Sequence, residues 1–161
     1  MTGRPASLAA LLLAHDATED DTDTLDDMTR TALEVGAAPI VVALPAGVEP
    51  PPRARVVRSR PGGPLITALR LGMAQLTNSP ASAVLLLPLR GIHPRRDSLR
   101  ALVDGAKGAG DAIVAFEDAS LDDAPVLIPR DAWLELVTMG EGGLGALAER
   151  RRVLRVDAPL D

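Results

Sequence analysis

Leu8-Ala9-Ala10-Leu11-Leu12-Leu13 is a short, unbroken apolar run, and Ala83-Val84-Leu85-Leu86-Leu87 is a second. Such runs are too short to cross a membrane and have the length of a strand buried on both faces. Two more runs of this kind cover residues 39–44 and 112–116. Strands buried on both faces are typical of parallel sheets covered by helices. The four runs therefore predict the parallel centre of a sheet, with residues 83–87 in a central position.

Helical patterns alternate with these runs. Apolar residues recur at helical spacing in three long stretches: Leu25, Met28, Ala32 and Val35; Leu65, Leu69, Gly72, Met73 and Leu76; Leu99, Leu102, Val103 and Ala106. Shorter helices are expected around Trp133 and Leu147, and further strands at 55–58, 125–128 and 153–156. This alternation predicts a single three-layer α/β/α domain over residues 1–161, with a mostly parallel sheet.

Composition excludes several classes of function. The 161 residues include one Phe, one Trp and no Tyr, too few to stack nucleobases, and no Cys for disulfides or zinc knuckles. The net charge of −5 comes without a basic stripe, so no nucleic-acid partner is expected. No apolar run reaches the ~20 residues of a membrane span, and no signal-type cleavage site follows residues 8–14. We expect a cytoplasmic protein that does not bind membranes.

Ligands of open parallel sheets bind outside the carboxyl ends of the strands. Three loops are expected to converge there: residues 15–21, residues 61–65 and residues 88–94. Their candidate ligand-binding residues are His15, Asp16, Gly62, Gly63, Arg90 and His93. No catalytic residue and no metal ligand is predicted.

Several stretches, in order, resemble the MobA-like nucleotidyltransferases. They are the opening LAALLLA strand at residues 8–14, Gly63-Pro64-Leu65 followed by Gly72, Leu85-Leu86-Leu87-Pro88, Asp123-Ala124-Pro125-Val126-Leu127, and residues 140–147 and 153–156. The resemblance implies a nucleotidyltransferase topology of the GT-A, Rossmann-like type. It also implies transfer of a nucleotide from a nucleoside triphosphate onto a molybdopterin or a related small acceptor, assisted by magnesium.

The chemical motifs of that family are missing here. Its phosphate-binding GGxSxRMGxxK loop is replaced by His15-Asp16-Ala17-Thr18-Glu19-Asp20-Asp21. Carboxylates at ~4 Å from a phosphate would repel it by about 1–4 kcal/mol. In the family's PxDxP motif the aspartate binds magnesium, and Arg90 stands in its place here. A fixed cation at a metal ligand's position is incompatible with metal-assisted transfer as the family performs it.

The sequence thus predicts a degenerate nucleotidyltransferase-like domain that acts as a non-catalytic binding or assembly subunit without a cofactor. A link with molybdenum-cofactor enzymes is implied by the resemblance alone. We expect self-association or a protein partner, through the strand edge at residues 53–60 or the helix around Trp133. The alternative is an active nucleotidyltransferase that uses magnesium and a nucleoside triphosphate through a rearranged site.

Each candidate residue also has a plainer interpretation. Residues 16–27 place oxygens at calcium-loop positions, but Asp21 stands where that loop needs glycine, so a solvated loop before a helix is favoured. His15 and His93 are ligands or bases, or merely polar groups at strand ends. Arg90 binds an anion or, as we favour, pairs with Asp16 or Glu19. Gly62-Gly63 cradles a phosphate or, more simply, forms a tight turn.

Overall fold

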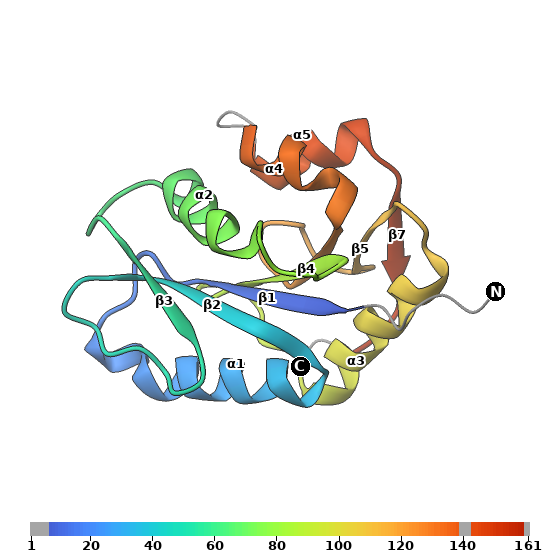
Figure 1. The fold of residues 1–161 in the computed structure, drawn as a ribbon. Helices are drawn as coiled ribbons and strands as arrows, with labels where there is room; N and C mark the ends of the chain where they lie inside the picture. The colour runs from blue at the N-terminus through green and yellow to red at the C-terminus, as the bar shows by residue number, and fades with distance from the viewer. Residues whose placement is uncertain (1–6, 139–142, 160–161) are drawn as a thin grey trace.

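The apolar runs form the middle of a seven-stranded sheet in a computed structural model of the chain, which describes residues 7–138 and 143–159 (Figure 1). The strands are β1 (Leu8–Leu13), β2 (Ala37–Pro45), β3 (Arg55–Ser59), β4 (Ala83–Pro88), β5 (Ile113–Phe116), β6 (Val126–Pro129) and β7 (Val153–Val156). Their spatial order is β3-β2-β1-β4-β6-β5-β7. The strand expected near residues 125–128 is therefore inserted between β4 and β5.

One described strand opposes the others. β6 runs antiparallel to both β4 and β5, whereas β1 pairs in parallel with β2 and β4, and β2 with β3. Since β4 and β5 both oppose β6, they share a direction, as the sequence predicted for the four apolar runs. The carboxyl ends of β1, β2 and β4 consequently lie at one edge of the sheet.

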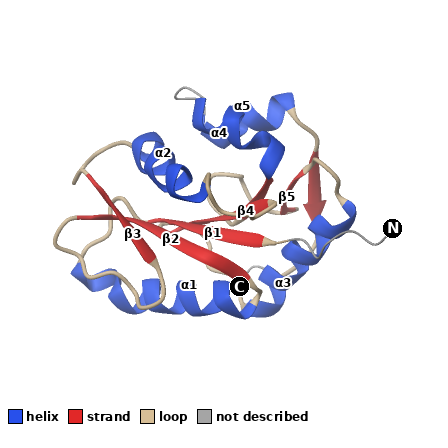
Figure 2. Cartoon of the chain, in the orientation of Figure 1, coloured by secondary structure: helices blue, strands red, loops and turns tan. Residues whose placement is uncertain are grey.

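Helices cover both faces of this sheet (Figures 1 and 2). The helices α1 (Thr22–Glu34) and α3 (Arg96–Gly105) lie on one face, and α2 (Leu65–Leu76), α4 (Trp133–Thr138) and α5 (Gly143–Arg150) lie on the other. The expected three-layer architecture is confirmed. The stretch 140–147 that resembles a family helix begins outside the described residues, and α5 covers its remainder. None of the described helices has the length and apolar character needed to traverse a bilayer.

β1 contributes side chains to the two hydrophobic cores, one on each face of the sheet. Ala10 and Leu12 belong to the cluster beneath α1 and α3, and Ala9 and Leu11 to the cluster beneath α2 and α4. This division follows from the two-residue period of a strand. Every residue of β1 is buried, so the strand holds the two layers together.

Gly72 allows α2 to approach β1 closely. A Cβ atom at Gly72 would lie 2.3 Å from Cδ1 and 3.1 Å from Cγ of Leu11. Leu11 is fully buried, so its side chain has no empty space into which it can turn. The glycine is therefore required by packing, although glycine weakens a helix.

We predict that Gly72→Ala lowers the free energy of unfolding by about 1–3 kcal/mol, because an overfilled core must shift. Gly145→Ala in α5 is the matched control, since its Cβ would meet no atom within 4 Å. That change should raise stability by about 0.5–1 kcal/mol through helix propensity alone. Urea unfolding followed by circular dichroism measures both. Equal effects of the two substitutions would contradict the packing role of Gly72.

Candidate functional site

Loops from distant parts of the chain enclose a cavity at the carboxyl edge. Its volume is about 170 Å³. Leu89 N donates to Leu13 O (3.1 Å), which ties the loop after β4 to the end of β1. The cavity is lined by Leu13, His15, Asp16, Leu65, Leu86, Pro88, Leu89, Arg90, Leu121, Asp122, Asp123, Ala124 and Leu144. Three of the sequence-predicted site residues, His15, Asp16 and Arg90, thus come together.

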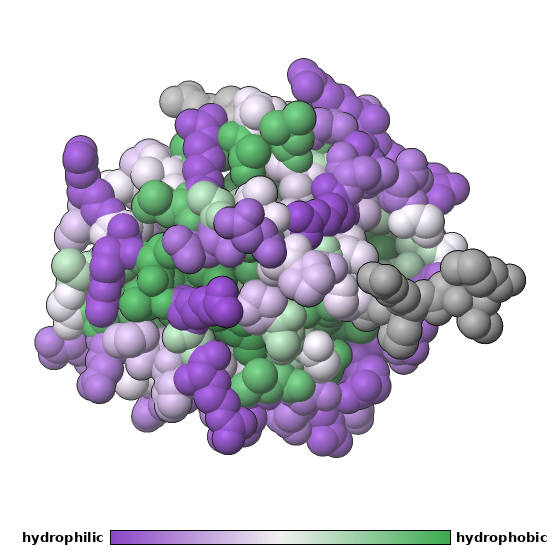
Figure 3. All heavy atoms as spheres, viewed as in Figure 1, coloured by the Kyte–Doolittle hydropathy of each residue, from purple (hydrophilic) through white to green (hydrophobic). Residues whose placement is uncertain are grey.

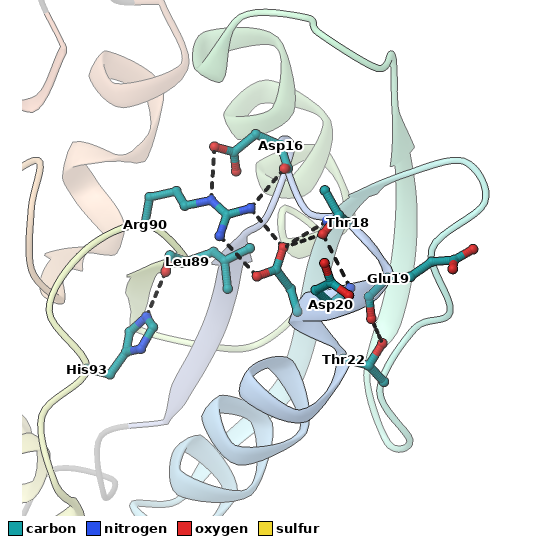
Figure 4. A network of polar contacts seen from close by, with 9 residues as sticks. Asp16, Thr18, Glu19, Asp20, Thr22, Leu89, Arg90 and His93 are labelled. Carbon is teal, nitrogen blue, oxygen red and sulfur yellow. Dashed lines mark hydrogen bonds and ion pairs between the residues drawn. The ribbon is translucent and has the colours of Figure 1, made fainter.

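Arg90 bridges the loops after β1 and β4 (Figure 4). Its Nη1 and Nη2 donate to the two carboxylate oxygens of Asp21 (3.0 and 2.8 Å). Its Nε donates to Oδ2 of Asp16 (3.3 Å), and Nη2 also donates to Asp16 O (3.1 Å). The bidentate geometry with Asp21 is the strong form of an arginine–carboxylate pair. One guanidinium therefore pairs with both carboxylates and neutralises one of their two charges.

A short helical turn holds Asp21 in place. Thr18 caps the 3₁₀ helix η1 (Glu19–Asp21): its Oγ1 accepts from Asp20 N (3.3 Å), and its own N donates to Oδ2 of Asp21 (2.8 Å). The Asp21 side chain is only 14% exposed. The Arg90 guanidinium, followed by the Thr18 N–H, holds the pKa of Asp21 below its ordinary value. Asp21, reciprocally, raises the pKa of Arg90.

The expected pairing of Arg90 with Asp16 or Glu19 is confirmed for Asp16. Asp16 does pair with Arg90, but Glu19 does not, and Asp21 takes its place. In a 3₁₀ helix with three residues per turn, residues 19 and 21 lie on different sides, so only one can face Arg90. The Thr18-x-x-Asp21 spacing is a capping box, and this signal could have identified Asp21 from the sequence.

The calcium interpretation of residues 16–27 does not fit the structure. η1 and α1 begin inside this segment, at Glu19 and Thr22, so the residues do not form one continuous loop. The carboxylates of Asp16 and Asp21 are directed at Arg90. Within residues 7–138 and 143–159, no three His, Cys, Asp or Glu side chains are grouped so that they could hold a metal ion.

His93 lies apart from His15, contrary to the expected convergence. Its Nε2 contacts Leu89 O (2.8 Å), and it lines another cavity, of about 220 Å³, between α1 and the segment after β4. The chain turns at Gly91, where a Cβ would lie 2.3 Å from Asp123 O, and this turn carries His93 toward the α1 face. His15 Nδ1 is buried and has no hydrogen-bond partner within the described part of the chain.

Gly62 and Gly63 form a tight turn before α2. Gly62 has a φ of 74°, and Gly63 N donates to Arg60 O (2.9 Å). Neither glycine lines the cavity, whereas Leu65, the first residue of α2, does. The loop after β3 therefore contributes an apolar wall to the cavity.

Magnesium, which the resemblance implies, does not fit these residues. Asp16 and Asp21 already pair with the guanidinium of Arg90, and a divalent ion beside that group would be repelled by it. The other charged side chains on the cavity are Asp122 and Asp123. A triphosphate would meet these carboxylates, with the one arginine of the lining already engaged.

We predict that the Arg90–Asp21 pair makes stability depend on pH. The pKa of Asp21 is lower in the folded protein than in the unfolded chain. The pair therefore contributes its full stabilisation of the fold at pH values above the pKa of an unfolded Asp, about 3.9. This stabilisation is lost as the pH falls through the lower pKa of the folded protein. Asp21→Asn should therefore be less stable than the wild type at pH 6, and the difference should shrink toward pH ~3. Urea unfolding across this range measures the difference.

Asp20→Asn is the control, because it removes a neighbouring charge that has no ion-pair partner among the described residues. It should follow the wild-type profile. A pH profile of Asp21→Asn parallel to that of the wild type would contradict the prediction.

No protein-family model matches the sequence, and no curated protein does. Solved structures do resemble it. A homologue of Rv0371c from Mycobacterium sp. strain JC1 has a TM-score of 0.71 at 17% identity, over 96% of this chain and 87% of that one. Rv0371c of Mycobacterium tuberculosis H37Rv, in complex with manganese, has a TM-score of 0.68 at 18% identity, over 96% of this chain and 90% of that one.

A nucleotidyl transferase from Methanothermobacter has a TM-score of 0.67 at 16% identity, over 94% of this chain and 87% of that one. Identities this low establish the fold alone. The chain therefore has the α/β fold of the nucleotidyltransferases.

Proposed function

We propose that this chain is a nucleotidyltransferase-like domain that transfers no nucleotide and acts as a non-catalytic binding or assembly module with a protein partner. The observation that carries the proposal is the position of Arg90, whose guanidinium is held by Asp16 and Asp21 at the carboxyl edge. The order of the MobA-like motifs supports a role beside molybdenum-cofactor enzymes.

The pairing of Arg90 with two carboxylates is the physical basis of this proposal. Metal-assisted transfer needs a divalent cation that neutralises the reacting phosphates, held by carboxylates with free oxygens. In this site the guanidinium of Arg90 takes the attraction of both neighbouring carboxylates. The same contacts prevent Arg90 from turning to a phosphate without leaving Asp21, whose side chain is largely buried, unpaired.

An active nucleotidyltransferase is the second candidate. It is favoured by the cavity at the carboxyl edge and by the solved complex of the similarly folded Rv0371c with manganese. Such an enzyme would have to release Asp16 and Asp21 from Arg90 before a metal ion could bind. The two candidates therefore differ in their response to metal and nucleotide.

We predict no pyrophosphate release from any of the common nucleoside triphosphates in the presence of magnesium. We also predict no shift in melting temperature with these ligands, because the carboxylates repel the phosphates. A ligand at 100 times its Kd would add about 2.7 kcal/mol, which raises the melting temperature by roughly 5 °C or more in a domain of this size. A coupled pyrophosphate assay and differential scanning fluorimetry test both points. Turnover or a shift of that size would establish the active enzyme instead.

We further predict that Arg90→Glu converts the site into one that binds a divalent cation. The new carboxylate would lie beside Asp16 and Asp21, so manganese should raise the melting temperature of this variant by several degrees. Arg90→Gln has the same shape without the charge and should not respond to manganese, and neither should the wild type. Stabilisation of the wild type by manganese would refute the proposal that Arg90 takes the place of the metal.

A further inference from the structure

We infer that the open edge of β3 docks an acidic, extended segment of a partner protein, which adds a strand to the sheet. This inference rests on the proposed function, because it gives the chemistry of the partner that a binding module requires. β3 is the last strand in the spatial order and, among the described residues, pairs only with β2, from Val41↔Arg55 to Pro45↔Ser59. Its outer side therefore presents backbone groups to which another strand can bind.

The segment of the chain that contains β3 carries charge of one sign. Residues 50–96 contain eight arginines and no Asp or Glu, and four of these arginines lie within residues 53–60. Arg58 is engaged, since its Nη1 donates to Pro45 O (2.9 Å) and Val48 O (2.8 Å). Arg53, Arg55 and Arg60 are exposed. None of these three forms an ion pair among the described residues, whereas Arg90, Arg96 and Arg151 all do.

Apolar side chains accompany this charge. Val56 is 37% exposed on β3, and Leu65 is 41% exposed at the start of α2, which contacts β3. Figure 3 shows apolar surface, in green, on this side of the molecule, with hydrophilic side chains, in purple, around it. A strand with alternating apolar and acidic residues would place its apolar set on the face of Val56 and its acidic set on the face of Arg55.

Other occupants fit this edge less well. A second copy paired through β3 would bring Arg53, Arg55 and Arg60 of both copies together, and like charges across a strand pair are destabilising. Single-stranded nucleic acid is held by aromatic stacking as well as by charge, and the chain's aromatic residues, Phe116 and Trp133, are buried. The helix around Trp133, the second surface expected from the sequence, exposes Leu134 but keeps Trp133 in the core.

The test uses a fluorescein-labelled, nine-residue peptide of alternating Glu and Val, titrated with the full-length protein and followed by anisotropy. We expect saturable binding in the micromolar range that weakens with salt. A peptide of alternating Lys and Val should not bind. The acidic peptide with N-methylated backbone amides should lose binding, because it keeps the charge but cannot form a strand ladder.

Reversal of the charge at three arginines is the second part of the test. The triple variant Arg53→Glu, Arg55→Glu, Arg60→Glu should weaken binding at least about tenfold, because three attractions become repulsions. Arg150→Glu, on α5 near the opposite edge strand β7, should leave the affinity unchanged. Circular dichroism of each variant verifies that it is folded.

Several outcomes would overturn the inference. They are anisotropy that stays flat through the micromolar range, equal binding of the N-methylated peptide, tighter binding of a single-stranded oligonucleotide, or a dimer in light scattering that the triple variant abolishes. The pyrophosphate assay separates this inference from the proposed function. Turnover would refute the proposed function whatever the peptide does, whereas absent turnover with absent peptide binding refutes only the docking edge.

Discussion

The complete burial of β1 is the constraint on which the other features of this protein depend. All six residues of the strand are buried, between β2 and β4 within the sheet and between helices above and below it. A polar side chain on this strand would lose its hydration without gaining a partner, so the polar groups of this segment lie beyond the end of β1. His15 and Asp16 occupy that point. The parallel pairing with β4 then brings Arg90 to the same edge, because Leu13 lies opposite Pro88.

At that edge, electrostatics decides what the fold can do. Two loops rich in polar residues meet beside a cavity, an arrangement that in open α/β sheets usually serves a ligand. Here the charged side chains of the two loops pair with each other, since Arg90 is bound by Asp16 and Asp21. The bond also joins the segment before α1 to the loop before α3, so it links two parts of the layer on one face of the sheet. The contact that, in the proposed function, takes the place of a metal therefore also joins these two segments.

The fold was predictable from the sequence because its strongest signals are physical. Runs such as residues 83–87 have the length and composition of a doubly buried strand, and the stripes of α1, α2 and α3 have helical period. The direction of β6 was not predictable, because a four-residue apolar run reads the same for a parallel and an antiparallel strand. Its antiparallel pairing depends on the path of residues 117–125.

For the candidate site, the sequence predicted that Arg90 forms an ion pair with a carboxylate of the loop after β1. The choice of Asp21 over Glu19 depended on a capping box, and the separation of His93 from His15 depended on the turn at Gly91, where tertiary contact with Asp123 decides the path.

The unequal distribution of charge along the chain connects the site with the edge of the sheet. The acidic residues of 16–27 lie in η1 and α1 or face Arg90, so they are held on one side of the molecule. The arginines of residues 53–60 follow a strand at the far end of the sheet order, and Arg53, Arg55 and Arg60 form no ion pair with those carboxylates among the described residues. With no acidic residue between Glu49 and Asp97, the chain offers these arginines no partner nearby in sequence. Of the eight arginines in residues 50–96, Arg90 is neutralised inside the site, whereas Arg53, Arg55 and Arg60 keep their charge at the surface. A strand edge that keeps such a charge resists a second copy of itself and is complementary to an acidic chain.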